Sequence, residues 1–411
     1  MLESFANFLQ NTGLYALISS GGIDAVKTII MIAIACVLLY LAIVKKFEPL
    51  LLLPIAFGML LSNLPMIKDS SAIMMHTEFF TNPEYMTDGK YINVGYICQH
   101  GGLLDLLYLG VKLGIYPPLI FVGIGCMTDF GPLIANPKSI LLGAAAQFGV
   151  FFTFVGALVL SALVPSINFG IKEAASIGII GGADGPTAIY VTKSLAPALL
   201  PAIAVAAYSY MALIPVIQPP IMKLMTRKKD RMIVMEQLRP VSKTEKILFP
   251  IIVTIIVALI IPDAVSLVGC LMLGNLMKES GVVERLTKMA QNELMNIITL
   301  FLGVTVGATA TASSFLSAQT IGIIVLGLIA FCFSTVGGLF LGDIMCWVTK
   351  GKVNPLIGSA GVSAVPMAAR VSQTVGQKEN PSNFLLMHAM GPNVAGVIGS
   401  AVAAGVFLAM F

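Results

Sequence analysis

The residues Gly181–Ala188, with the sequence GGADGPTA, decide how the fold of this chain is interpreted. They place a carboxylate, several glycines and a proline inside a long apolar region. Flexible glycines precede Asp184, the residue before Pro186 is disfavoured in the α region, and proline suits the first turn of a new helix. The stretch therefore predicts a helix, a break and a second helix. In a bilayer such a break needs protein or water around it, and a carboxylate there indicates a functional site.

The composition of the whole chain is typical of a polytopic membrane protein. Of the 411 residues 57% are hydrophobic and only 11% are charged, whereas soluble domains carry about 25% charged residues. Several apolar runs reach the roughly 20 residues that cross a hydrocarbon core, which predicts an all-α fold with about ten crossings, some of them discontinuous. The net charge of +4 comes without a basic stripe interleaved with aromatic residues, so no nucleic-acid partner is expected.

Two further features concern processing and metals. The first residues, MLESFANF, contain an acidic residue and no basic region before an apolar core, so no cleavable signal peptide is expected. The six cysteines are scattered without metal-ligand spacing and are expected to be small core residues.

The charges outside the apolar runs predict the topology. A lysine pair follows the first predicted span, Val26–Val44, and marks a cytoplasmic end, so the N-terminus is expected outside. Residues 67–115 carry an excess of acidic residues and are predicted to form an outer loop. The strongest basic run lies in residues 223–246 and predicts a cytoplasmic linker. This linker either only fixes the topology or also offers a docking surface to a soluble partner.

The linker divides the chain into two predicted membrane repeats, residues 1–222 and 247–411. The second half repeats the order of spans and breaks of the first, and Asn354–Pro366 falls where Gly181–Ala188 fell. Paired discontinuous helices in two repeats are typical of secondary transporters. The repeats are inverted if each half crosses the membrane an odd number of times.

The polar residues at the predicted breaks are mostly oxygen donors. They are Asp129, Asp184, Thr187, Asn354, Ser363 and Asn393, with Tyr210 and Arg370 on neighbouring segments. Carboxylate, hydroxyl and carbonyl oxygens suit a hard cation such as Na⁺, and three histidines with dispersed cysteines argue against zinc or iron. The alternatives are a cap or an interhelical hydrogen bond for Asn393 and a merely paired carboxylate for Asp184.

Two side-chain roles stay open at this stage. Arg370 follows Ser363 by seven residues, on nearly the same helical face, and either reaches the membrane interface or receives an anionic group. Tyr208 and Tyr210 point in different directions on a helix, so at most one of them faces a given site. The chain has no GxxxxGK[ST] loop, so no ATP hydrolysis is expected. These residues indicate a Na⁺- or H⁺-coupled membrane protein and do not distinguish a transporter from a pump.

Three segments closely resemble the β subunit of the bacterial Na⁺-translocating decarboxylases, above all oxaloacetate decarboxylase. They are GIIGGADGPTAIY around Asp184, NPLIGSAGVSAVPMAAR from Asn354 to Arg370, and HAMGPNVAGVIGS from His388. The resemblance covers nearly the whole chain. The loop after Pro65 is shorter than the family leads one to expect, which leaves the ion site untouched.

The resemblance implies a function and roles for individual residues. In that family a soluble carboxyltransferase moves CO₂ from an acid to biotin on a carrier domain, and the β subunit decarboxylates carboxybiotin and exports Na⁺ while a proton is consumed. The resemblance implies that Asp184, Asn354 and Asn393 form the Na⁺ site. It implies that Tyr210, Ser363 and Arg370 serve the second ion or proton path and the carboxybiotin end. Gly358 matches a position where backbone segments approach closely, and Asp129 and Thr187 are further candidates. Arg370 would attract the carboxybiotin carboxylate.

The resemblance also implies partners and a location. The partners are an α subunit with carboxyltransferase and biotin carrier, a small membrane γ or δ subunit, lipid, and a further copy of the chain in a homo-oligomer. The location is the bacterial cytoplasmic (inner) membrane, with several passes. Oxaloacetate is the first expectation for the acid, ahead of methylmalonyl-CoA and glutaconyl-CoA. The competing interpretation is a stand-alone Na⁺-coupled carboxylate symporter or Na⁺/H⁺ exchanger.

Overall fold

The computed structural model describes residues 8, 10, 12–46, 49–65, 75–80, 82–87 and 91–411. Within these ranges the regular secondary structure is helical apart from one short hairpin, in which Met86–Thr87 (β1) pairs antiparallel with Tyr91–Ile92 (β2). The predicted all-α polytopic architecture is thereby confirmed. Most of the residues used for the signal-peptide expectation, and part of the predicted outer loop, lie outside the described residues.

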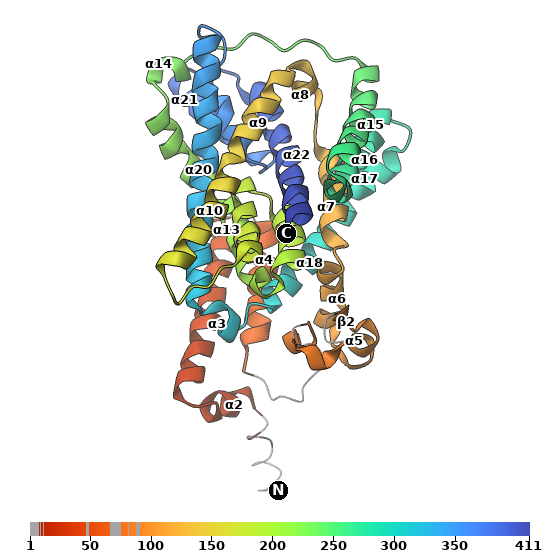
Figure 1. Cartoon of the computed structure of the whole chain (residues 1–411), viewed down its shortest axis with the longest axis vertical. Coiled ribbons are helices and arrows are strands. Elements are labelled where there is room, and N and C mark those ends of the chain that lie inside the picture. The colour runs from red at the N-terminus through yellow and green to blue at the C-terminus, as the bar shows by residue number, and fades with distance from the viewer. Residues whose placement is uncertain are drawn as a thin grey trace.

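The helices run in chain order along a tall molecule (Figure 1). Before the linker they are α2 (Gly13–Ser19), α3 (Gly22–Ile43), α4 (Pro49–Asn63), η1 (Thr77–Phe80), η2 (Pro83–Tyr85), α5 (Val94–His100), α6 (Leu103–Lys112), α7 (Tyr116–Met127), α8 (Gly131–Ala135), η3 (Pro137–Ser139), α9 (Ile140–Ala146), α10 (Phe148–Leu163), α11 (Ile171–Gly178), η4 (Ile179–Gly182), α12 (Gly185–Leu195), η5 (Pro197–Leu199) and α13 (Leu200–Met225). From the linker onward they are α14 (Lys228–Arg231), α15 (Lys243–Ile260), η6 (Pro262–Ala264), α16 (Val265–Ser280), α17 (Glu284–Met289), η7 (Ala290–Leu294), α18 (Met295–Ala308), α19 (Ala312–Phe315), α20 (Ala318–Val348), η8 (Pro355–Gly361), α21 (Met367–Glu379) and α22 (Leu386–Met410).

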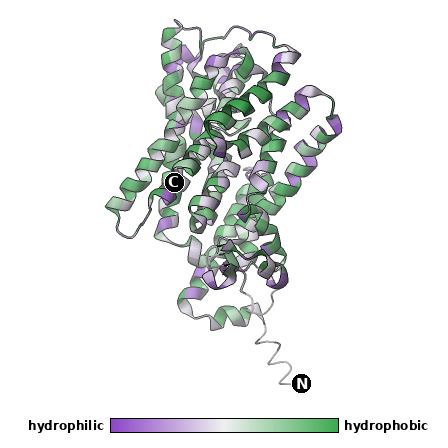
Figure 2. Cartoon of the chain, turned by 45° about the vertical axis from the view of Figure 1, so that its right-hand side comes forward, coloured by the Kyte–Doolittle hydropathy of each residue, from purple (hydrophilic) through white to green (hydrophobic). Residues whose placement is uncertain are grey.

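Several of these helices have the length and apolarity of membrane spans. Among the described residues, four helices qualify singly: Gly22–Ile43, Pro137–Leu163, Ala318–Val348 and Leu386–Met410. Two bent pairs raise the number to six, one joining α6 to α7 at 71° and one within Pro197–Met225 at 62°. Apolar residues cover much of the helical ribbon (Figure 2). The remaining apolar helices are shorter or broken, so the expected total of about ten crossings stays a prediction.

Two helix pairs repeat one another across the halves. α4 packs on α18 and α7 packs on α16, and each pair meets through glycines that lie against backbone carbonyls of the other helix. Each of the four helices carries one such glycine. Three residues before this glycine lies the carbonyl that the glycine of the other helix meets. The contacts are Gly58 with Val304 and Gly307 with Ile55 in the first pair, and Gly274 with Val122 and Gly125 with Leu271 in the second. Exchanging α4 with α16 and α18 with α7 maps these contacts onto one another, which agrees with two repeats; the division into repeats stays a prediction.

The two ends of the molecule differ. The N-terminal helices, the hairpin, α5 and α6 gather at one end, and the linker between α14 and α15 crosses the other (Figure 1). The cytoplasmic location of the linker, expected from its basic run under the positive-inside rule, stays a prediction. The predicted break at Gly181–Ala188 is confirmed: η4 ends at Gly182, Ala183 takes a left-handed conformation with φ of 56°, and α12 begins at Gly185.

Candidate functional site

Asp184 is fixed by the backbone of the break that carries it. It is the N-cap of α12, and its Oδ1 accepts a hydrogen bond from the backbone N–H of Thr187 at 3.2 Å. An aspartate at this position satisfies one of the free N–H groups of a helix N-terminus, where the helix dipole favours negative charge. The side chain is 5% exposed, so the carboxylate sits inside the bundle rather than at its surface. Thr187 itself is fully buried beside it.

The second carboxylate oxygen joins three distant parts of the chain. Oδ2 of Asp184 accepts from the Ser363 hydroxyl at 3.1 Å and from the Ser400 hydroxyl at 2.9 Å. The two hydroxyls are 3.3 Å apart. The breaks also bond through their backbones, since the N–H of Ser363 donates to the carbonyl of Gly182 at 2.9 Å. Both helix breaks and α22 thus meet at one carboxylate.

Asn393 holds the second break in place from α22. Its amide donates to the carbonyls of Ala360 at 3.0 Å and Val362 at 2.7 Å, immediately before Ser363. Its own Oδ1 is buried without a hydrogen-bond partner. The amide thus makes the interhelical bonds that were the alternative role for this residue, while the carbonyl oxygen stays available to a ligand.

Other buried oxygens lie unpaired near this centre. The ring of Tyr208 packs on Gly185, the residue after Asp184, and its hydroxyl has no partner. Gln147 donates its amide to the Gly396 carbonyl at 3.3 Å and leaves its Oε1 unpaired. Because buried polar atoms are nearly always paired, unpaired oxygens beside a carboxylate indicate a ligand or water.

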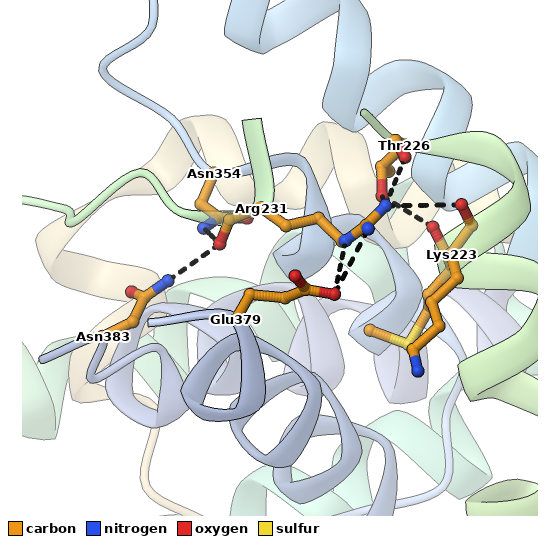
Figure 3. Close-up of polar contacts among 7 residues, drawn as sticks. Lys223, Thr226, Arg231, Asn354, Glu379 and Asn383 are labelled. Atoms are coloured by element: carbon orange, nitrogen blue, oxygen red, sulfur yellow. Dashed lines mark hydrogen bonds and ion pairs between the residues drawn. The ribbon is translucent and has the colours of Figure 1, made fainter. Parts of the chain in front are cut away.

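Asn354 is not beside Asp184. It caps η8 by accepting from the Leu356 N–H, and its amide donates to the carbonyls of Arg231 and Ile233, both at 2.9 Å. Figure 3 shows Asn354 and Asn383 converging on the linker residue Arg231, whose guanidinium pairs with Glu379 at 3.2 Å. The seven residues of η8 and the extended Val362 separate Asn354 from Ser363, and η8 alone rises by about 14 Å as a 3₁₀ helix. In this structure Asn354 ties the linker to the second break.

Within the described part of the chain, Tyr210, Arg370, Gly358 and Asp129 form no hydrogen bond or ion pair with Asp184. The hydroxyl of Tyr210 donates to the carbonyl of Ile324 on α20. Arg370 is exposed on α21 and forms no ion pair within the part of the chain that the structure describes. Gly358 lies against the backbone carbonyl of Gly338. Asp129 is 41% exposed and pairs with Lys246 at 3.4 Å.

A small cavity reaches Asp184 from the side of α7. Its volume is about 140 Å³, and it is lined by Ile124, Met127, Thr128, Asp184, Pro186, Met211, Ser363, Val365, Pro366, Met390 and Val397. The residues that line the cavity are apolar apart from Asp184, Ser363 and Thr128. An ion that enters the cavity therefore loses most of its hydration shell and meets one carboxylate.

Sequence reasoning missed Ser400, and Gln147 with it. Ser400 follows Asn393 by seven residues and so shares its helical face, which was a usable signal. Ser400 lies inside the predicted last span rather than at a predicted break, so its position alone did not mark it as a site residue. Of the two tyrosines, the structure places Tyr208 against Gly185, the residue next to Asp184.

Comparison with known proteins places this chain in a family. Residues 27–411 match the family described as Na+-transporting oxaloacetate decarboxylase beta subunit. The chain belongs to this family. The resemblance seen in the sequence is thereby confirmed for nearly the whole chain.

Several relatives in this family are similar to the chain over most of their length. The methylmalonyl-CoA decarboxylase subunit beta of Propionigenium modestum is 58% identical, with 100% of this chain and 100% of the relative covered. The glutaconyl-CoA decarboxylase subunit beta of Acidaminococcus fermentans is 57% identical, with 93% of this chain and 92% of the relative covered. The probable oxaloacetate decarboxylase beta chain of Vibrio cholerae is 52% identical, with 99% of both covered. The names of these relatives specify three different acids.

Proposed function

We propose that this chain decarboxylates carboxybiotin and couples the reaction to Na⁺ export, with a proton consumed. The observation that carries the proposal is the joining of both helix breaks and α22 at Asp184, at the end of an apolar cavity. Membership of a Na⁺-transporting decarboxylase family supports it. Na⁺ is the cargo, and carboxybiotin is supplied by a partner's carrier domain.

The donor set around Asp184 suits a monovalent cation. One carboxylate with the hydroxyl oxygens of Ser363 and Ser400 offers a single negative charge and several neutral oxygens, the ligand type that hard cations prefer. Unwound backbone at the breaks adds carbonyls, as in other transporters with discontinuous helices. Without the ion, the two hydroxyls donate to Asp184. With Na⁺ bound, the hydroxyl hydrogens turn away and the same oxygens face the ion.

Coupling requires the ion and the carboxylated ring to affect each other. Loss of CO₂ from the N-carboxylate leaves an electron pair on the ureido nitrogen, which takes a proton, so the products are CO₂ and biotin. Removing the carboxylate from water favours this step. We assign Arg370 to attraction of the carboxylate and Ser363 to the link between the reaction and the ion. The bond from Tyr210 to Ile324 supports a positioning role for Tyr210 beside the proton path.

For the acid, we propose methylmalonyl-CoA ahead of oxaloacetate, which reverses the order expected from the sequence. The methylmalonyl-CoA relative aligns with this chain over 411 residues with both chains fully covered, whereas the alignment with the oxaloacetate relative extends to 436 residues. This difference agrees with the short loop after Pro65. Assays of the purified complex with methylmalonyl-CoA, glutaconyl-CoA and oxaloacetate test the order directly.

The proposed partners are an α subunit with carboxyltransferase and biotin carrier, and a small membrane γ or δ subunit, in the bacterial inner membrane. Co-purification separates this assignment from a stand-alone symporter or exchanger. A decarboxylase subunit brings down a biotinylated protein visible on an avidin blot, and a symporter does not.

The decisive experiment uses the complex reconstituted in vesicles. Decarboxylation is expected to drive Na⁺ transport, and Asp184→Asn is expected to abolish both Na⁺-dependent turnover and transport, because the substitution removes the carboxylate at which both breaks and α22 meet. Normal Na⁺-dependent turnover in that variant would overturn the assignment of Asp184.

A further inference from the structure

A larger cavity lies at the linker end of the molecule. Its volume is about 480 Å³, and it is lined by Asp129, Gly131, Pro132, Ala135, Met235, Gln237, Leu238, Arg239, Val241, Lys246, Phe384, Met387 and His388. The size falls within the roughly 300–1,000 Å³ of small-molecule sites. The lining joins one apolar wall to two cations and one carboxylate, so it suits a ligand with an apolar body and an anionic end.

The roof of this cavity is the linker, which is fixed in place. Residues 233–242 contain no helix or strand, yet Arg239 donates to the carbonyl of Ile134 at 3.1 Å and to the Glu245 carboxylate at 2.8 Å. Glu245 also closes a capping box with Ser242 at the start of α15. With its guanidinium engaged on both sides, Arg239 holds the roof over the cavity rather than offering donors to a ligand.

Lys246 is the cation that is available inside. Its Nζ lies 3.4 Å from Asp129 and 3.7 Å from Glu279, both long for ion pairs, and its side chain is 28% exposed. An ammonium has three donors, and two long contacts leave capacity for a stronger partner. Nδ1 of His388, another residue that lines this cavity, is buried without a hydrogen-bond partner.

The larger cavity lies next to the smaller one that ends at Asp184. The turn after α7 borders both, with Thr128 on the smaller and Asp129 on the larger cavity. The first turn of α22 does the same, with Met390 on the smaller and Met387 on the larger. A molecule that enters under the linker therefore faces the wall behind which Asp184 lies.

We propose that this cavity is the entrance site for carboxybiotin, with Lys246 binding the carboxylate, His388 bonding the ureido group and the apolar wall packing on the ring. The proposal rests on the proposed function and adds the residues through which the partner's biotin is received. Arg370 lines neither cavity, so Lys246 is the cation in direct contact at this stage.

The test measures how the complex discharges carboxybiotin. Purified complexes with Lys246→Gln, Lys246→Arg or Lys243→Gln receive saturating acid substrate radiolabelled in the transferred carboxyl group, at saturating Na⁺. Lys243 is the matched control, because it is exposed on the same helical turn and does not line the cavity. Turnover, the fraction of carrier biotin that is carboxylated, and the Na⁺ concentration for half-maximal rate are recorded.

Lys246→Gln is expected to lower turnover about tenfold, as loss of one charge-assisted hydrogen bond implies, and to raise the carboxylated fraction. Lys246→Arg should restore both values, Lys243→Gln should match the wild type, and the Na⁺ dependence should not change. Ala135→Phe fills the cavity without touching the charges and should also cause carboxybiotin to accumulate.

Three results would overturn the proposal. Unchanged turnover and carboxylated fraction in both Lys246→Gln and Ala135→Phe would exclude this cavity as the entrance. A failure of Lys246→Arg to restore turnover, together with a shifted Na⁺ dependence, would assign Lys246 a purely structural role. A wild-type complex that never discharges carboxybiotin would refute the proposed function itself and this proposal with it, so the two failures are distinguishable.

Discussion

Ser400 on α22 donates its hydroxyl hydrogen to Asp184 at 2.9 Å, although the two residues are 216 positions apart in the chain. The bond lies inside the bundle, where both residues are buried. It makes α22 part of the proposed ion site together with the two helix breaks. Any movement of α22 relative to the first break has to break this bond or carry Asp184 along.

Ser400→Ala is therefore expected to weaken Na⁺ binding. The variant removes one neutral oxygen from the donor set, and the Na⁺ concentration for half-maximal turnover should rise about tenfold. The maximal rate at saturating Na⁺ should change less. Ser194→Ala is the control, since the hydroxyl of Ser194 bonds only within its own helix, to the Tyr190 carbonyl at 3.4 Å. Equal Na⁺ dependence in Ser400→Ala and the wild type would remove Ser400 from the site.

Asn354→Asp distinguishes a sodium ligand from a linker tether. The substitution keeps the acceptor that caps η8 but replaces the amide that donates to Arg231 and Ile233 by an oxygen facing two carbonyls. We expect a loss of about 1–3 kcal/mol of stability, seen as a lower midpoint of thermal unfolding in detergent, with unchanged Na⁺ affinity in the folded protein. Tighter Na⁺ binding without loss of stability would instead support the ligand role that the resemblance implied.

The sequence predicts the local part of this site and misses the long-range part. Gly and Pro around Asp184 specify a break directly, because their backbone preferences act on neighbouring residues. Which hydroxyls meet Asp184 depends on the packing of segments far apart in the chain, and no local pattern encodes that. For the same reason the position of Asn354 at a break does not reveal that its amide bonds the linker.

Tyr210→Phe and Tyr208→Phe should have different consequences for stability. The Tyr210 hydroxyl bonds a carbonyl of α20, so its removal leaves a polar group unpaired and should cost about 1 kcal/mol. The Tyr208 hydroxyl is buried without a partner, so its removal should leave the unfolding midpoint unchanged or raise it. Thermal unfolding of the two variants side by side measures the difference. A larger loss in Tyr208→Phe would show that the hydroxyl of Tyr208 does have a partner.

The glycines of the two repeated helix pairs give a prediction about the repeats themselves. A methyl group at Gly307 would meet the carbonyl of Ile55, and one at Gly125 would meet the carbonyl of Leu271. Because rigid backbone cannot move aside as a side chain can, each alanine substitution should separate its helix pair and cost about 2 kcal/mol. If the pairs are equivalent, the two losses should be similar, measured as shifts of the unfolding midpoint in the same detergent.

Gly156→Ala is the matched control for this pair of variants. It also lies within an apolar helix, but a methyl group there would make only an ordinary contact with the Leu326 side chain, at 3.7 Å. Alanine is the better helix former by about 1 kcal/mol, so this variant should be as stable as the wild type or more stable. A loss of stability at Gly307 with none at Gly125 would show that the two helix pairs contribute unequally to stability. The pairs would then be alike in geometry but not in energetics.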